Sequence, residues 1–189
     1  MLFPVKAPER PATWLSRIRD WLARWQSGPA ENAGEPRIKS RPIMDRVLKE
    51  IFVPELRARG FTGSLPHFRR IGADRIDLVT VQYSRYGGEF VVELSQCGPE
   101  GVRADRGKEA PPDKVTAHHL FGRDRYRLSF KPGGRGQWFV FDDDPQAATT
   151  EAAIEAACAK AARAALEAFA GQAEPWWEKK AAAERTARK

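Results

Sequence analysis

The stretch RIDLVTVQYSRYGGEFVVELS, residues 75–95, decides the fold of this chain. Residues 76–84 and 89–95 are rich in β-branched and aromatic side chains, which favour strands. The glycine pair Gly87-Gly88 between them supplies the positive φ angles that a tight connection needs. The stretch therefore predicts an antiparallel hairpin.

With Ser84 opposite Gly88, the alternation of side chains gives the hairpin two distinct faces. The face predicted as core holds Ile76, Leu78, Phe90, Val92 and Leu94. The other face mixes apolar and acidic side chains, namely Val79, Val81, Tyr83, Asp77, Glu89 and Glu93. Gln82 falls on the apolar face near the turn, where its amide is either satisfied by structural hydrogen bonds or directed at a ligand.

The composition is that of one globular domain with appendages, since the chain has 189 residues, 42% of them hydrophobic and 30% charged. No stretch approaches the length of a membrane span and the N-terminus lacks the apolar core of a secretory signal, so a cytoplasmic location is expected. Cys97 and Cys158 lie far apart and in no metal-ligand spacing, which fits reduced thiols. We expect no cofactor and no metal.

The net charge of +7 is concentrated near the N-terminus. Residues 1–41 carry 8 basic and 4 acidic side chains, whereas residues 42–147 carry 17 and 15. A nearly neutral body argues against a global phosphate-binding surface and leaves a local basic stripe open.

Residues 1–26 form an N-terminal extension, in which residues 12–26 have the apolar spacing of an amphipathic helix. Its predicted partner-binding residues are Trp14, Ile18, Trp21 and Trp25. Because a tryptophan buries about 150–250 Å² when packed, this face should dock. The alternatives are its own domain or a sister subunit, another protein, and an anionic membrane surface. Residues 27–41 are rich in Gly and Pro and are predicted as a linker.

The body is predicted over residues 42–178, and it begins with a helix from Pro42 that is kinked at Pro54 and stopped by Gly60-Phe61. Further strands are expected at 67–71, 124–130 and 137–141, with a loop at 96–116. In the strand at 124–130, Tyr126, Leu128 and Phe130 are expected to share one face. The last helix is expected from Thr149 or Thr150 to about Ala170, broken at Gly171 and Pro175 and followed by a charged tail at 179–189.

Several motifs that could indicate a functional site are better explained as structural features. The glycines of residues 131–136 lead into a strand and not a helix, which favours a hairpin loop over a phosphate cradle. The acidic run 142–144 lacks the spacing of a calcium loop. His118 and His119 are adjacent and His67 is distant, so no residue is assigned a catalytic or metal-binding role.

The candidate polar surface consists of Arg69, Gln82, Arg125 and Arg127, with Arg70 and His118 as possible additions. Arginines in a row on one sheet face can fork to phosphates or carboxylates of a partner. The alternative is that they pair across strands with Glu89, Glu93 or Asp77.

From about Met44 to Trp177 the chain resembles the bacterial family catalogued as domain of unknown function 4304. The resemblance is carried by Gly60-Phe61, Phe68-Arg69-Arg70, the strand 79–84 with Gln82 and Ser84, Phe90-Val91-Val92, Arg127-Leu128 and Trp138. It implies a small α+β domain of unsettled function. Some members look like accessory genes near toxin or defence systems, which by analogy favours an immunity-type or other binding role.

We therefore predict a single α+β domain with an antiparallel sheet of about five strands, two main helices on one face of the sheet, and the N-terminal amphipathic helix. The predicted function is a non-catalytic protein-protein interaction module that binds a protein partner or a second copy through the open sheet face or the tryptophan helix. The alternatives are nucleic-acid binding through the arginine strand and loop 96–116, and an enzyme of unknown type.

Overall fold

A computed structural model describes residues 40–105, 107–130, 138–142 and 150–187. The predicted helix at 12–26 and its linker therefore lie outside the described residues, apart from the linker's last two, which open the first helix. The elements are α2 (Ser40–Ala58), β1 (Thr62–Ser64), β2 (His67–Ile71), β3 (Ile76–Tyr83), β4 (Glu89–Cys97), β5 (Arg125–Arg127), β6 (Phe139–Val140) and α3 (Glu151–Ala187). Two short 3-10 helices, η1 (Ala117–His119) and η2 (Gly122–Asp124), precede β5.

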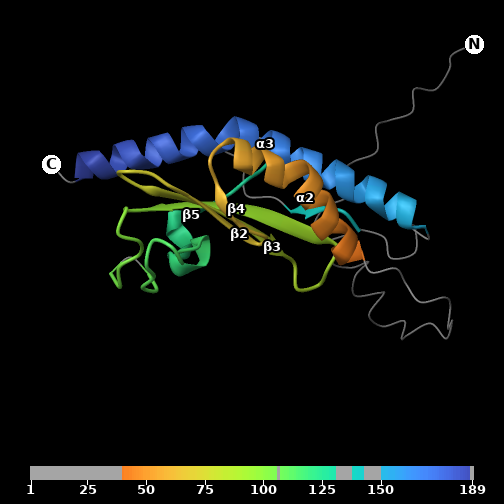
Figure 1. Cartoon of the computed structure of the whole chain (residues 1–189), viewed down its shortest axis with the longest axis horizontal. Helices are drawn as coiled ribbons and strands as arrows, with labels where there is room; N and C mark the ends of the chain where they lie inside the picture. Colours follow the sequence, from red (N-terminus) through yellow and green to blue (C-terminus); the bar gives the residue numbers. More distant parts are fainter. Residues whose placement is uncertain (1–39, 106, 131–137, 143–149, 188–189) are drawn as a thin grey trace, which may run out of the picture. The chain divides into compact units, whose positions relative to one another are not determined.

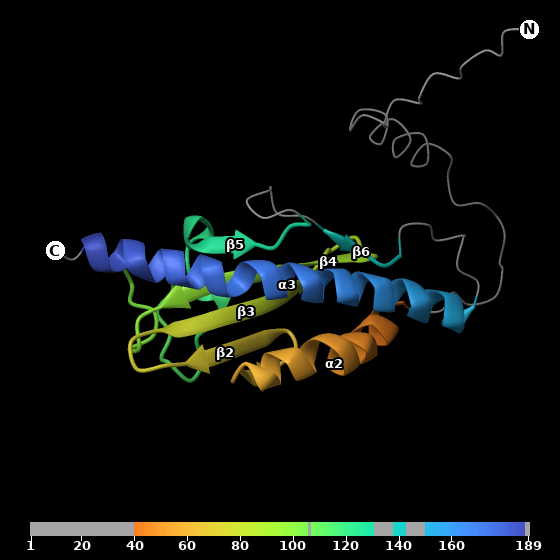
Figure 2. The same cartoon turned by 90° about the horizontal axis from the view of Figure 1, so that it is seen from above.

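The α+β class and the antiparallel sheet are confirmed. The strands follow the order β1-β2-β3-β4-β5, all pairs are antiparallel, and β6 pairs with the other end of β4. Helices α2 and α3 both lie along one face of this sheet (Figures 1 and 2). Within the part of the chain that the structure describes, no helix is long and apolar enough to cross a membrane.

Helix α2 ends where the sequence predicts. Gly60 has a φ of +82°, its N–H donates to the carbonyl of Arg57, and the N–H of Phe61 donates to the carbonyl of Leu56. This pair of hydrogen bonds is the Schellman arrangement, which satisfies the last carbonyls of a helix. Pro54 lies within the helix without ending it. The turn places the buried ring of Phe61 in the core beneath α3.

The hairpin forms, but its register differs from the prediction by one residue. Ser84 pairs with Glu89 and not with Gly88, because both glycines adopt positive φ inside a connection that spans residues 85–88. A shift of one residue moves every side chain of β3 to the opposite face relative to β4. The residues of β3 in the main core are thus Val79, Val81 and Tyr83, and the predicted core residues Ile76 and Leu78 lie on the other face together with Gln82.

The sheet carries apolar cover on both faces. The larger core lies between the sheet and the two helices. A smaller core joins Ile76, Leu78 and Cys97 to the segment that follows β4, and it is completed by Val102, Ala110, Val115, Ala117 and Leu120. The expected loop at 96–116 therefore begins as strand and then folds back over the second face, which is not the open surface that the sequence suggested (Figure 1).

The last helix is longer than predicted. Thr150 caps it as expected, since its Oγ1 accepts from the N–H of Ala153 at 3.3 Å, but the helix continues through Gly171 and Pro175 to Ala187. The physical reason is that the buried stripe persists beyond the two helix breakers, at Phe169, Ala173, Trp177 and Ala181. Tertiary burial therefore outweighs the low helix propensity of Gly and Pro, and much of the predicted charged tail is helical.

Strands β5 and β6 are shorter than the strands that the sequence predicts at 124–130 and 137–141. The chain leaves the sheet after Leu128, because the backbone of Ser129 turns to exchange hydrogen bonds with the side chain of Gln172 on α3. Phe130, predicted to face inward with Tyr126 and Leu128, is consequently 52% exposed.

Alanine substitutions of two glycines test the end of α2 and the continuity of α3. Gly60→Ala should lower the free energy of unfolding by about 1–2 kcal/mol, because alanine strains at positive φ. Gly171→Ala should raise it by roughly 0.5–1 kcal/mol, because this glycine is exposed within a continuous helix and an added Cβ would meet nothing within 4 Å. Urea denaturation of both variants measures the sign of each change in the free energy of unfolding. Destabilisation by Gly171→Ala would contradict a continuous α3.

Candidate functional site

A row of polar side chains crosses four strands on the face away from the helices. Its members are direct cross-strand partners in the order His67, Thr80, Glu93 and Arg127. Alternation then puts Arg69 and Gln82 on this face, and it also puts Arg125 there beside Ser95. The structure thus assembles on one face all four residues of the predicted polar surface.

Glu93 is the centre of this face. Its side chain is only 3% exposed, and its two carboxylate oxygens lie 2.8 Å from Nε of Arg127 and 3.2 Å from an Nη of Arg125. Nε2 of His118 lies 3.7 Å away, and Arg127 also stacks at 5.8 Å over the ring of Trp138. The alternative that pairs the arginines across strands therefore holds for Arg125 and Arg127, whose charges are directed at a buried carboxylate.

The two other predicted polar residues stand apart from this cluster. Gln82 is a half-buried neighbour of Val91 near the turn. Arg69 lies beside Leu78, and its Nε is buried without a hydrogen-bond partner among the described residues. Arg70 points to the helix face, where it joins Asp77 at 2.8 Å to Glu174 of α3 at 2.7 Å.

His67 and His118 are far apart in the sequence, but their side chains contact each other in the structure. The rings of His67 and His118 lie edge to face with centroids 5.3 Å apart, and Nδ1 of His67 is 3.1 Å from the hydroxyl of Thr80. Burial lowers the pKa of both, and each is lowered further by nearby positive groups, although Glu93 partly opposes this for His118. Nδ1 of His119 accepts from Thr116 instead. Within the described ranges, no group of three His, Cys, Asp or Glu side chains could hold a metal ion.

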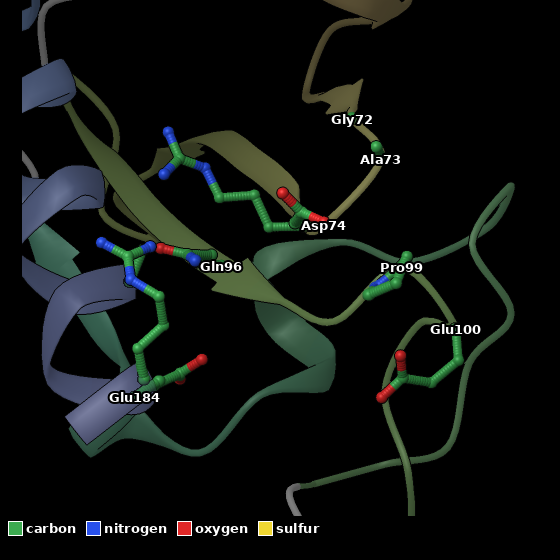
Figure 3. A pocket seen from close by; sticks show the side chains of 10 residues that line it. Gly72, Ala73, Asp74, Gln96, Pro99, Glu100 and Glu184 are labelled. Carbon is green, nitrogen blue, oxygen red and sulfur yellow. The ribbon is translucent and has the colours of Figure 1, made fainter. Parts of the chain in front are cut away.

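A second polar region lies where β4 ends beneath the last turns of α3. A cavity of about 710 Å³ opens there, between the β2–β3 turn, the end of β4 and α3. Figure 3 shows Asp74, Gln96, Glu100 and Glu184 around this space. An adjoining cavity of about 220 Å³ shares Gln96, Glu100 and Glu184 and is also lined by Cys97.

Gln96 is the unusual member of this cavity wall. Its side chain lies on the helix face of β4, only 2% of the residue is exposed, and its Oε1 has no hydrogen-bond partner among the described residues. A buried amide oxygen without a donor costs about 1–3 kcal/mol, so such atoms are rare in folded proteins. Sequence reasoning missed Gln96 because it was placed at the start of a loop, where an exposed glutamine needs no explanation.

The lining of this cavity carries more acidic than basic side chains. It has the carboxylates of Asp74, Glu100 and Glu184 and the guanidinium groups of Arg75 and Arg185. Arg75 is engaged by the buried Asp77, with Nε 3.1 Å from Oδ1. The neighbouring thiol responds to these charges, because burial raises the pKa of Cys97 to about 12 and the carboxylates of Glu100, Glu184 and Asp77 contribute in the same direction.

A comparison with protein-family models matches residues 52–179 to the domain of unknown function DUF4304. The match runs from the middle of α2 to the buried Trp177 and just beyond, so it includes the polar row and most of the cavity wall. No curated protein and no solved structure matches the chain.

Removal of the charge at Glu93 tests the polar row. Glu93→Gln should lower the free energy of unfolding by at least about 2 kcal/mol, because it leaves Arg125 and Arg127 without their shared carboxylate. Glu89→Gln, on the same strand and face, should change it by less than about 0.5 kcal/mol. Equal effects of the two substitutions in chemical denaturation would show that the ion pairs of Glu93 contribute nothing specific.

The histidine pair predicts a pH dependence of stability. Because the folded pKa values of His67 and His118 lie below the ordinary value of 6.5, the unfolded chain binds more protons than the folded one as the pH falls through 6.5. Stability should therefore fall between about pH 7.5 and about pH 5.5, where histidine is the group that ordinarily titrates. The double variant His67→Gln, His118→Gln should show a shallower fall in melting temperature over this range. An identical slope would refute the assignment.

Proposed function

The chain belongs to the DUF4304 family of domains of unknown function, and from that premise we propose that it is a non-catalytic protein-binding module whose partner docks at the cavity beside Gln96. The observation that carries the proposal is the buried, unpaired amide oxygen of Gln96 in the wall of a cavity that opens to solvent. A domain that retains an unpaired acceptor loses stability, and a donor from a partner would restore that free energy in the complex.

The state of the titratable groups supports binding over catalysis. Burial raises the pKa of Cys97 to about 12 and that of Cys158 to about 11, so both are neutral thiols near pH 7 and poor nucleophiles. Both carboxylate oxygens of Glu93, the buried acid of the polar row, are engaged in ion pairs with Arg125 and Arg127 and not directed at an open cavity.

The charges also favour a protein partner over nucleic acid. Arg125 and Arg127, the basic residues that motivated the nucleic-acid alternative, are neutralised in part by Glu93. The cavity is lined by more carboxylates than guanidinium groups, which repels phosphate. A volume of about 710 Å³ lies within the ~300–1,000 Å³ range of binding pockets, and it suits a few side chains of a partner's loop or terminus.

Site-specific photo-crosslinking of the full chain in its native host tests this proposal. A photoreactive residue in place of the exposed Glu100, at the cavity, should yield a discrete protein adduct. The matched control is Glu167, which is exposed on α3 and does not line the cavity. The adduct at position 100 should weaken when Glu184→Lys reverses a charge of the cavity wall. The same adducts at both positions, or none at position 100, would overturn the proposal.

A further inference from the structure

We propose that the cavity beside Gln96 is a guanidinium-binding site, with Gln96 as the residue that receives the cation. The inference rests on the proposed function, because it names the chemical group that the same cavity takes. It draws on three independent observations, which are the unpaired acceptors, the balance of charge, and the size of the space.

The unpaired acceptors are clustered. Among the described residues, three buried side-chain atoms have no hydrogen bond, and two of them, Oδ1 of Asp77 and Oε1 of Gln96, belong to directly paired positions on β3 and β4. Arg75 lies 3.1 Å from Oδ1 of Asp77, but it does not meet the geometry of a hydrogen bond there. Asp77 does not line the cavity and its carboxylate is already in ion pairs with Arg70 and Arg75, so Oε1 of Gln96 is the acceptor of the cavity wall that lacks a donor.

The balance of charge selects a cation. Asp74, Glu100 and Glu184 line the cavity, and Arg75 is already drawn to Asp77. Lys180 lies nearby but pairs with Asp124 at 3.2 Å as well as with Glu184 at 3.7 Å. Arg185 is exposed and also lines the cavity. The cavity wall thus carries three carboxylates and two guanidinium groups, and this excess of negative charge favours a cationic ligand over an anion.

The size and shape of the space select a planar organic cation. The cavity, about 710 Å³ in volume, is far larger than an ion requires, and the described residues include no three-ligand metal cluster. A guanidinium group presents five N–H donors in one rigid plane, so a single group can donate to the amide oxygen of Gln96 and to a carboxylate of the wall together. An ammonium group is more strongly hydrated and lacks this fork.

Two sources of guanidinium are compatible with this chemistry, an arginine side chain of a protein partner and a free small molecule. We would titrate the full chain with three probes: the blocked tripeptide Gly-Arg-Gly, the same tripeptide with citrulline in place of arginine, and agmatine. Citrulline keeps the planar N–H donors and removes the charge. The arginine peptide should bind at least about tenfold more tightly than the citrulline peptide, and added salt should weaken its binding.

Gln96→Met is the decisive variant. It keeps the volume and removes the acceptor, so it should weaken the arginine peptide by about tenfold or more. The same substitution should raise the melting temperature of the free protein by at least about 2 °C, since an unpaired buried oxygen is lost. Gln82→Met, on the opposite face of the sheet, is the control and should leave binding unchanged. Unaltered binding by Gln96→Met would overturn the site, and equal binding of citrulline would overturn the requirement for a cation.

The outcomes also separate this inference from the proposed function. Tighter binding of the peptide than of agmatine supports an arginine of a protein partner, and the reverse supports a small guanidine as ligand of the same site. A protein adduct at position 100 without binding of any guanidinium probe overturns the present inference and leaves the protein-binding proposal intact. Binding of a guanidinium probe without a protein adduct at position 100 overturns the protein-binding proposal and leaves the guanidinium site intact.

Discussion

The burial of Trp177 fixes α3 to the sheet, and the other features of the domain depend on it. Its ring is fully buried, it packs against Phe61 and Phe169 at centroid distances of 5.5 and 6.1 Å, and its indole N–H donates to the carbonyl of Ser95 at 2.8 Å. Because a buried indole N–H requires an acceptor, this one hydrogen bond sets both the depth and the rotation of the helix. The helix then carries Ala181 and Glu184 across the end of β4 and so forms one wall of the cavity.

The ion pairs on the two faces of the sheet are arranged differently. On the face away from the helices, Glu93 forms ion pairs with Arg125 and Arg127, so the charges of the polar row partly neutralise one another. On the helix face, Arg70 links Asp77 to Glu174, and hydrogen bonds from Arg70 lower the pKa of Glu174 whereas burial raises that of Asp77. Arg70 is thus shared between two acids, and the acceptors next along the sheet are left short of donors. The unpaired oxygen of Gln96 lies where this network ends.

Local signals in the sequence predicted the hairpin, the stop at Gly60 and the alternation of Tyr126 and Leu128, because turn chemistry and the period of two act over a few residues. The predicted register of the hairpin was wrong because Gly87 and Gly88 allow connections that differ by one residue. Only packing against α2 and α3 selects one of these connections. The full length of α3 was missed because Gly171 and Pro175 are strong local breakers, while the burial of Trp177 depends on a strand more than eighty positions earlier in the chain. Gln96 carried no local signal, since its environment is formed by three distant segments.

Helices α2 and α3 lie against each other although they are encoded at opposite ends of the domain, with the rings of Phe52 and Phe169 at 5.5 Å and Arg46 at 3.1 Å from Glu155. During synthesis the ribosome releases α2 and the hairpin first, and their apolar faces have no cover until α3 emerges. The native core therefore cannot close vectorially from the N-terminus. The nascent chain leaves the apolar face of its sheet uncovered until α3 has been synthesised, and such exposed apolar surface is prone to aggregation.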